Sequence, residues 1–162
     1  MAQTITKENL DTLAANNNTT WEETDPAIDA ALQASLQADI LAEANAARAA
    51  AGQGAAATID DLSDEELAQV VGAVLTNNPT LTTNQVTAVV RAAARGRTGA
   101  GIAVIAGAAA YARPDTAKQV QLAAISVAPD GSEQIITRAT VISAVNAVND
   151  SGDEVETNVS DS

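Results

Sequence analysis

The chain has 162 residues, with 21 acidic and 8 basic side chains, a net charge of −13 and a pI near 4.1. It contains no cysteine and no histidine, which excludes disulfides, thiolate chemistry and zinc sites built on those ligands. The length predicts one domain, with or without tails. No secretory signal is visible at the N-terminus, and no apolar window approaches the roughly 20 residues that a membrane span needs. We therefore expect a cytoplasmic protein that does not associate with a membrane.

The excess of acid has a physical consequence for the conditions in which the chain folds. Its only lysines are Lys7 and Lys118. At low salt a charge of this size repels itself and destabilises the compact state, whereas at molar salt the Debye length falls to about 3 Å and the penalty largely disappears. With its small apolar residues, the whole chain resembles the proteins of haloarchaea and their viruses in style. An ordinary acidic bacterial or phage protein is the alternative.

Residues 1–24 are polar and rich in Asn and Thr, and we expect them to form an extended N-terminal arm. Trp21 is the only large anchor in this arm. Its side chain either packs on the domain to which the arm belongs or fills a pocket on a neighbouring subunit, since tryptophan is enriched at interface hot spots.

A helical domain of about four alanine-rich helices is predicted over residues 25–113. The first helix begins with Asp25 as its N-cap and Pro26 in the first turn, and ends at Gly52. It carries apolar residues at helical spacing along one face.

Two capping boxes mark the next two helices. In each, a Ser or Thr stands three residues before a Glu or Gln, so that each side chain can bond the backbone N–H of the other residue. These pairs are Ser63 with Glu66 and Thr82 with Gln85. The two helices form a hairpin, and residues 100–112 follow as a short buried helix.

The C-terminal segment, residues 114–149, allows two interpretations. The β-branched run Ile135-Ile136-Thr137 and the turn sequence at 129–132 favour a β-hairpin. Two further helices are the alternative, because Asp115 and Ser132 could both be N-caps. Residues 150–162 form an acidic tail, and we find no repeat of fixed period. The fold class is therefore mainly α: a small helical bundle, with a C-terminal hairpin or helix pair and extended terminal arms.

The sequence offers little for catalysis. The densest acidic cluster, Asp60 to Glu66, could hold a divalent cation, but carboxylates at a helix start are typical of capping and of the helix dipole. The stretch Arg95 to Gly101 resembles a phosphate loop only superficially, since it lacks the Gly-Lys-Ser/Thr ending. We expect no cofactor, no metal and no enzymatic activity. A divalent-metal enzyme using the carboxylates near Asp61 is the weaker alternative.

The basic residues are unevenly distributed. No acid occurs between Leu67 and Ala112, and this interval or its edge holds four arginines. They are Arg91, Arg95, Arg97 and Arg113. Either they pair with acids of the first two helices of the helical domain, or they contact an acidic neighbour or a phosphate backbone, for which the guanidinium fork is suited. The acidic chain as a whole argues against general DNA binding.

A small helical domain with long arms resembles the head–tail connector (adaptor) proteins of tailed viruses, here of a halophilic host. The resemblance rests on the helical core at residues 25–113. It implies a non-enzymatic structural subunit of the virion that is assembled in the host cytoplasm, forms a homo-oligomeric ring and contacts portal or tail subunits, with incidental DNA contact. Its arms would clasp neighbours, and Trp21 and the arginines would lie at interfaces. The alternative is a small acidic regulatory or adaptor protein that binds a helical or acidic partner.

Overall fold

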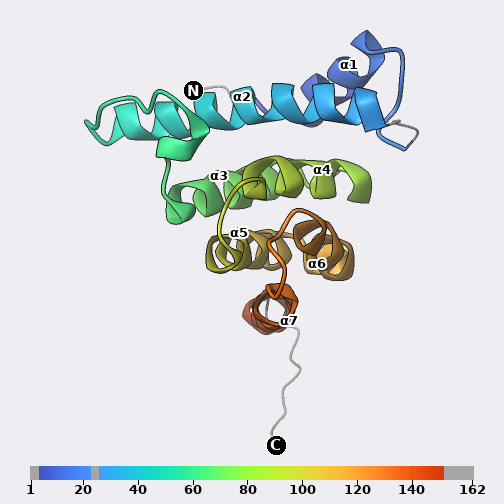
Figure 1. Ribbon diagram of the computed structural model, residues 1–162, viewed down its shortest axis with the longest axis vertical. Helices are drawn as coiled ribbons and strands as arrows, with labels where there is room; N and C mark the ends of the chain where they lie inside the picture. The colour runs from blue at the N-terminus through green and yellow to red at the C-terminus, as the bar shows by residue number, and fades with distance from the viewer. Residues whose placement is uncertain (1–3, 23–25, 152–162) are drawn as a thin grey trace, which may run out of the picture.

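A computed structural model describes residues 4–22 and 26–151 (Figure 1). These residues form seven α-helices and two short 3-10 turns, with no strand among them. The α-helices are α1 (Lys7–Asn16), α2 (Pro26–Ala50), α3 (Asp64–Asn77), α4 (Thr83–Ala94), α5 (Gly99–Ala112), α6 (Ala117–Ser126) and α7 (Glu133–Asp150). The turns are η1 (Ile59–Asp61) and η2 (Pro114–Thr116). The prediction of a mainly α fold is confirmed. About four helices is too few for the described fold, because α1, α6 and α7 are added to the four helices within residues 25–113.

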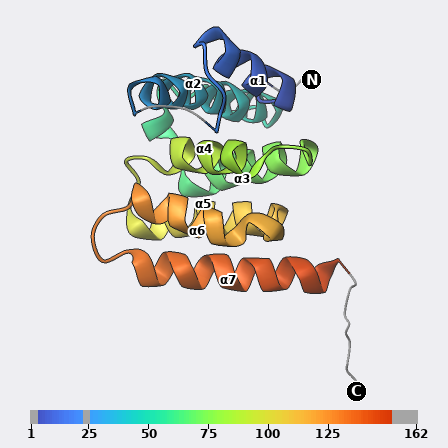
Figure 2. The same cartoon turned by 90° about the vertical axis from the view of Figure 1, so that its right-hand side faces the viewer.

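The helices lie in successive layers (Figures 1 and 2). α1 and α2 form one end, the hairpin of α3 and α4 comes next, then α5 and α6, and α7 forms the other end. α5 packs on both α3 and α7, while α4 packs on α2 and α6. α2 is seen from its side and α7 end-on in Figure 1, whereas α7 is seen from its side and α2 is foreshortened in Figure 2, so the helix axes turn along the stack.

This stack contains a structural repeat. The N-caps of α3, α5 and α7 are Ser63, Thr98 and Ser132, which stand 35 and 34 positions apart. Four residues after each cap, the side chain is fully buried. These three side chains are Leu67, Ile102 and Ile136. The helix pairs α3–α4 and α5–α6 and the helix α7 thus begin with the same pattern and stack on one another, a repeat that was not detected in the sequence.

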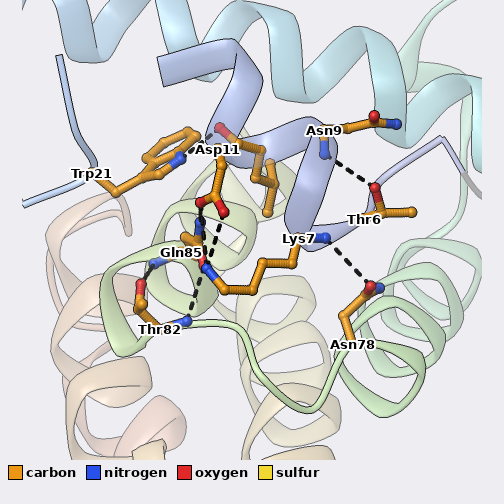
Figure 3. Close-up of polar contacts among 9 residues, drawn as sticks. Thr6, Lys7, Asn9, Asp11, Trp21, Asn78, Thr82 and Gln85 are labelled. Atoms are coloured by element: carbon orange, nitrogen blue, oxygen red, sulfur yellow. Dashed lines mark hydrogen bonds and ion pairs between the residues drawn. The ribbon is translucent and has the colours of Figure 1, made fainter. Parts of the chain in front are cut away.

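The expected N-terminal arm contains a packed helix. The Thr6 hydroxyl accepts from the Asn9 backbone N–H and caps α1, while Leu10 is 2% exposed. Figure 3 shows how α1 is tied to α4 and to the end of α3: the Gln85 amide of α4 donates to Asp11 at 2.6 Å, and the Lys7 backbone N–H donates to Asn78 Oδ1 at 3.4 Å. Residues 4–22 therefore belong to the domain core.

The C-terminal segment is two helices, so the β-hairpin interpretation is wrong. Ile136 and Thr140 are buried at a spacing of four residues, which suits a helix face rather than a strand. The buried Thr140 hydroxyl has a hydrogen-bond partner, because it donates to the Ile136 carbonyl at 3.1 Å. α7 packs along α5, and this tertiary contact outweighs the β propensity of the Ile-Ile-Thr run.

The predicted caps explain where the middle helices begin. Both capping boxes form: Ser63 N–H donates to Glu66 Oε1 at 2.9 Å, and Thr82 N–H donates to Gln85 Oε1 at 3.0 Å. α2 ends two residues before Gly52, whose φ of +75° suits glycine. The predicted cap Asp25 and residues 152–162 of the expected acidic tail lie outside the described residues.

Candidate functional site

A hollow of the described surface lies between α2 and α3. It has a volume of about 870 Å³, within the size range of ligand and peptide sites. Ala44, Val70 and Val74 are buried and form its apolar part. Alanines of α2 and α3 line the rest of its apolar surface, and their small side chains leave room for another backbone to approach. We call this hollow the α2–α3 groove.

An ion pair closes one part of this groove. Arg48 of α2 donates through Nε to Glu66 Oε2 at 2.6 Å and through a terminal nitrogen to Oε1 at 3.0 Å. Arg48 also donates to the Gly54 carbonyl at 3.1 Å. Glu66 is also the third residue of α3 and the partner of Ser63 in its capping box. One carboxylate therefore fixes both the start of α3 and the position of α2 beside it.

The loop that joins α2 to α3 is tied back to α2. The Asn45 amide accepts from the Ala56 N–H at 2.7 Å and donates to the Ala56 carbonyl at 3.0 Å. At the rim, Glu43 accepts from the Ile5 N–H at 3.0 Å. These bonds join the loop to α2 and join α2 to the N-terminal segment.

The charges of α2 and α3 affect each other. The hydrogen bond from Arg48, with help from the Ser63 N–H, lowers the pKa of Glu66 from its ordinary value of 4.5 to about 2. On α2, partial burial raises the pKa of Asp39, and the charge of Glu43 raises it further. The groove therefore keeps an ionised Glu66 paired with Arg48 across the physiological pH range.

A second, shallower groove of about 660 Å³ crosses α3, α5 and α7. Gly72 of α3, Val104 and Tyr111 of α5, and Ile135 of α7 contribute to its lining. The Tyr111 hydroxyl donates to Asp150 at 2.5 Å, and this bond raises the pKa of the phenol. Because the odd-numbered helices line this surface, it follows the direction of the stack.

Three of the four arginines predicted as contact residues pair within the chain. Arg91 lies 3.4 Å from Asp29 of α2, and Arg97 lies 2.8 Å from Asp64 of α3. Arg97 also donates to the Leu62 carbonyl at 2.8 Å. Their geometry favours internal pairing, the alternative that the sequence left open.

The remaining predicted contact residues differ in exposure. Arg113 pairs with Asp115 at 3.0 Å, and its hydrogen bond lowers the pKa of Asp115. Arg113 also donates to the Leu81 carbonyl. Arg95 is exposed and makes no ion pair with any described residue. Trp21 is 8% exposed and donates through its indole N–H to the Leu10 carbonyl at 2.8 Å. The five residues are thus spread over the fold, and their role at an interface stays a prediction.

The acidic cluster before α3 is used by the fold. Asp61 closes a capping box with Thr58, while Asp64 and Glu66 pair with arginines. Within the part of the chain that the structure describes, no group of three or more acidic side chains is arranged to hold a metal ion. None of the described helices is long and apolar enough to cross a membrane.

No protein-family model matches the chain, and no curated protein or solved structure matches it. Function must therefore be argued from the geometry alone. The α2–α3 groove was not predicted from the sequence, although a signal was present: Ala46, Ala47 and Ala50 recur at helical spacing and put small side chains on one side of α2.

Proposed function

We propose that this protein is a non-enzymatic adaptor that receives an amphipathic helix of another protein in the α2–α3 groove. The observation that supports this proposal most directly is an alanine-walled hollow of about 870 Å³ between two helices. An amphipathic helix laid into an apolar groove is a recurring mode of peptide recognition. A stack of helix pairs is also an architecture that offers extended binding surfaces.

The dimensions of the groove suit a helix rather than a compact metabolite. Its α2 wall runs from Glu43 to Ala50, which is about two helical turns or roughly 12 Å at 1.5 Å per residue. The polar groups around it are already engaged: Arg48 with Glu66, and Glu43 with the Ile5 N–H. What remains for a ligand is mainly apolar surface, which a partner helix covers by its own apolar face.

The test uses photo-crosslinking, with a matched control on the same helix. A benzophenone amino acid at Ala47, which lines the groove, should crosslink one defined partner in cells. The same amino acid at Ala34, an exposed position on α2 outside the groove, should not. Equal crosslinking from both positions, or none from Ala47, would contradict the proposal.

The partner identified in this way then allows a quantitative test. Ala47→Glu places a carboxylate in the apolar groove and should weaken binding of the purified partner by at least about tenfold, because its charge must be desolvated. Ala34→Glu should bind as the wild type does. Loss of binding in both variants would point to the overall charge of the chain instead of to the groove.

A virion role is one form of this proposal, in which the partner is a portal or tail subunit. It is supported by the salt-adapted composition, with a net charge of −13. The melting temperature should rise steeply from about 0.1 M to above 1 M KCl as self-repulsion is screened. A flat or falling melting temperature over this range would remove the argument for a halophilic origin.

A further inference from the structure

The outer face of α7 is apolar and open to solvent. Among the described residues, eight large apolar side chains are exposed, and five of them lie on α7. Val141 and Val145 are each 52% exposed and Val148 is 48% exposed. With Gln134 and Arg138 they recur at steps of four and three residues, the spacing of a helix–helix seam. We call these five residues the α7 seam.

The repeat shows which way the α7 seam faces. Gly107 of α5 lies nine residues after its cap Thr98, and a Cβ there would stand 3.0 Å from Ser143 Oγ of α7. This position of α5 therefore faces the next layer. Val141 lies nine residues after the cap of α7, Ser132, so it faces the place where one more layer would stack. Figure 2 shows α7 as the last layer on that side.

We propose that the α7 seam pairs with the α7 seam of a second copy, antiparallel and around a two-fold axis at Val141. In this pairing Val141 meets itself, Val145 meets Arg138, and Val148 meets Gln134. The stack then continues through the axis, so that α5, α7, the partner α7 and the partner α5 follow one another. The new interface extends the contact that already joins α5 to α7.

Charge is compatible with a second copy despite the acidity of the chain. Between Glu133 and Asp150, α7 carries no acid and a single base, Arg138. Two such faces meet without opposed carboxylates along the seam. The long apolar stem of Arg138 can cover the partner's Val145 while its guanidinium reaches water.

The distribution of apolar surface favours a closed pair over a chain of copies. A head-to-tail contact needs a second, complementary patch on each copy. Among the described residues of α1 to α4, no large apolar side chain is exposed, and the apolar surface of the α2–α3 groove is formed mainly by alanines, so a head-to-tail contact there would be lost in Ala47→Glu. A two-fold contact uses the same face twice and needs no other. Residues 152–162 are a poor alternative cover, since Val155 and Val159 are their only large apolar residues.

Solution mass at molar KCl tests the pairing. The wild type should have twice the mass of the monomer by light scattering coupled to gel filtration. Val141→Glu brings two carboxylates together at the axis, so it should weaken the dimer by about 100-fold or more while leaving the helical circular dichroism unchanged. Leu122→Glu, at an equally exposed position on α6, should remain dimeric.

A crosslink tests the geometry independently. Because the chain has no cysteine, Val141→Cys carries a single thiol, and a short bis-maleimide should link two copies covalently. Leu122→Cys should give little such product. A monomeric wild type, an unchanged dimer of Val141→Glu, or a dimer that Val141→Cys does not crosslink would each overturn the proposal.

Two more variants test whether the C-terminal tail covers the α7 seam and whether the α2–α3 groove takes part in dimerisation. Deletion of residues 152–162 should leave the dimer intact, and a dimer that appears only after this deletion would show that the tail covers the seam instead. Ala47→Glu, in the α2–α3 groove, should dimerise normally. Failure of the groove and failure of the seam are therefore observed in different variants.

Discussion

At one end of the stack, α1 and the segment that carries Trp21 pack on the core, and no large apolar side chain of α1 to α4 is exposed among the described residues. At the other end, α7 buries Ile136 and Thr140 but leaves three valines about half exposed. A stacked architecture needs a polar cap wherever stacking stops. The packed N-terminal layer provides such a cap at one end, and the α7 pairing proposed above would cover the apolar face at the other.

The largest expected difference between the ends concerns Trp21. Trp21→Ala leaves a cavity beside Leu10 and removes the indole N–H bond, so it should lower the free energy of unfolding by about 3 kcal/mol. Val141→Ala at the open end removes little buried surface and should change the stability of the monomer by less than about 0.5 kcal/mol. Urea unfolding of both variants at molar salt checks this. Equal losses would mean that the two ends are equally packed.

Cap residues give a smaller and closely matched comparison. The Ser63 hydroxyl accepts from the Glu66 N–H at 3.1 Å, whereas the Ser132 side chain makes no capping bond to α7. Ser63→Ala should therefore destabilise by about 1 kcal/mol, and Ser132→Ala by clearly less. Thermal melts of the two variants, side by side, measure the difference. If Ser132→Ala proves the more harmful, the hydrogen bonding assigned to these helix starts is wrong.

The pairing of Glu66 makes the N-terminal half sensitive to acid. Its pKa in the folded protein is about 2, below the ordinary 4.5, so the ionised form stabilises the fold above pH 4.5. This contribution is lost as the pH falls from 4.5 towards 2. Glu66→Gln removes it, so the decline of the melting temperature over this window should be shallower than in the wild type. An identical decline would show that other carboxylates control the acid response.

The smallest expected effect concerns Gln33, a buried polar residue in the N-terminal half of the stack. Gln33 of α2 is 2% exposed and donates to the Ala88 carbonyl at 3.2 Å, but its Oε1 has no partner among the described residues. Gln33→Met loses one bond and removes an unsatisfied acceptor, so stability should stay equal or rise by up to about 1 kcal/mol. A clear loss in a chemical melt would indicate that a water bonds this oxygen.

Local signals in the sequence were sufficient for the middle of the chain. The boxes Ser63–Glu66 and Thr82–Gln85 predicted where α3 and α4 begin, because capping depends on residues only three positions apart. Trp21 was placed in an arm because nothing near it in sequence shows that its partner is Leu10 of a short polar helix.

The repeat and the α2–α3 groove could not be predicted from neighbouring residues, because both depend on contacts between helices that are distant in the sequence. The first two units share a cap, an aliphatic residue four positions later and a proline at Pro79 or Pro114, while other core positions differ, as where Val71 and Val74 correspond to Ala106 and Ala109. So few shared residues hide the repeat in the sequence. The α2–α3 groove was likewise not predicted, because it depends on how two helices diverge rather than on any motif.

The junctions between units bear on how such a chain can change in length. Gly96 and Gly131 have φ values of +84° and +86° and lie one or two residues before the next cap. An insertion inside a helix would rotate every later side chain by about 100° per residue, which takes the buried face out of register. A whole unit added or lost between these glycines keeps each face in place. Natural length variants are therefore expected to differ in steps of about 34 residues, the repeat length of stacked helix pairs.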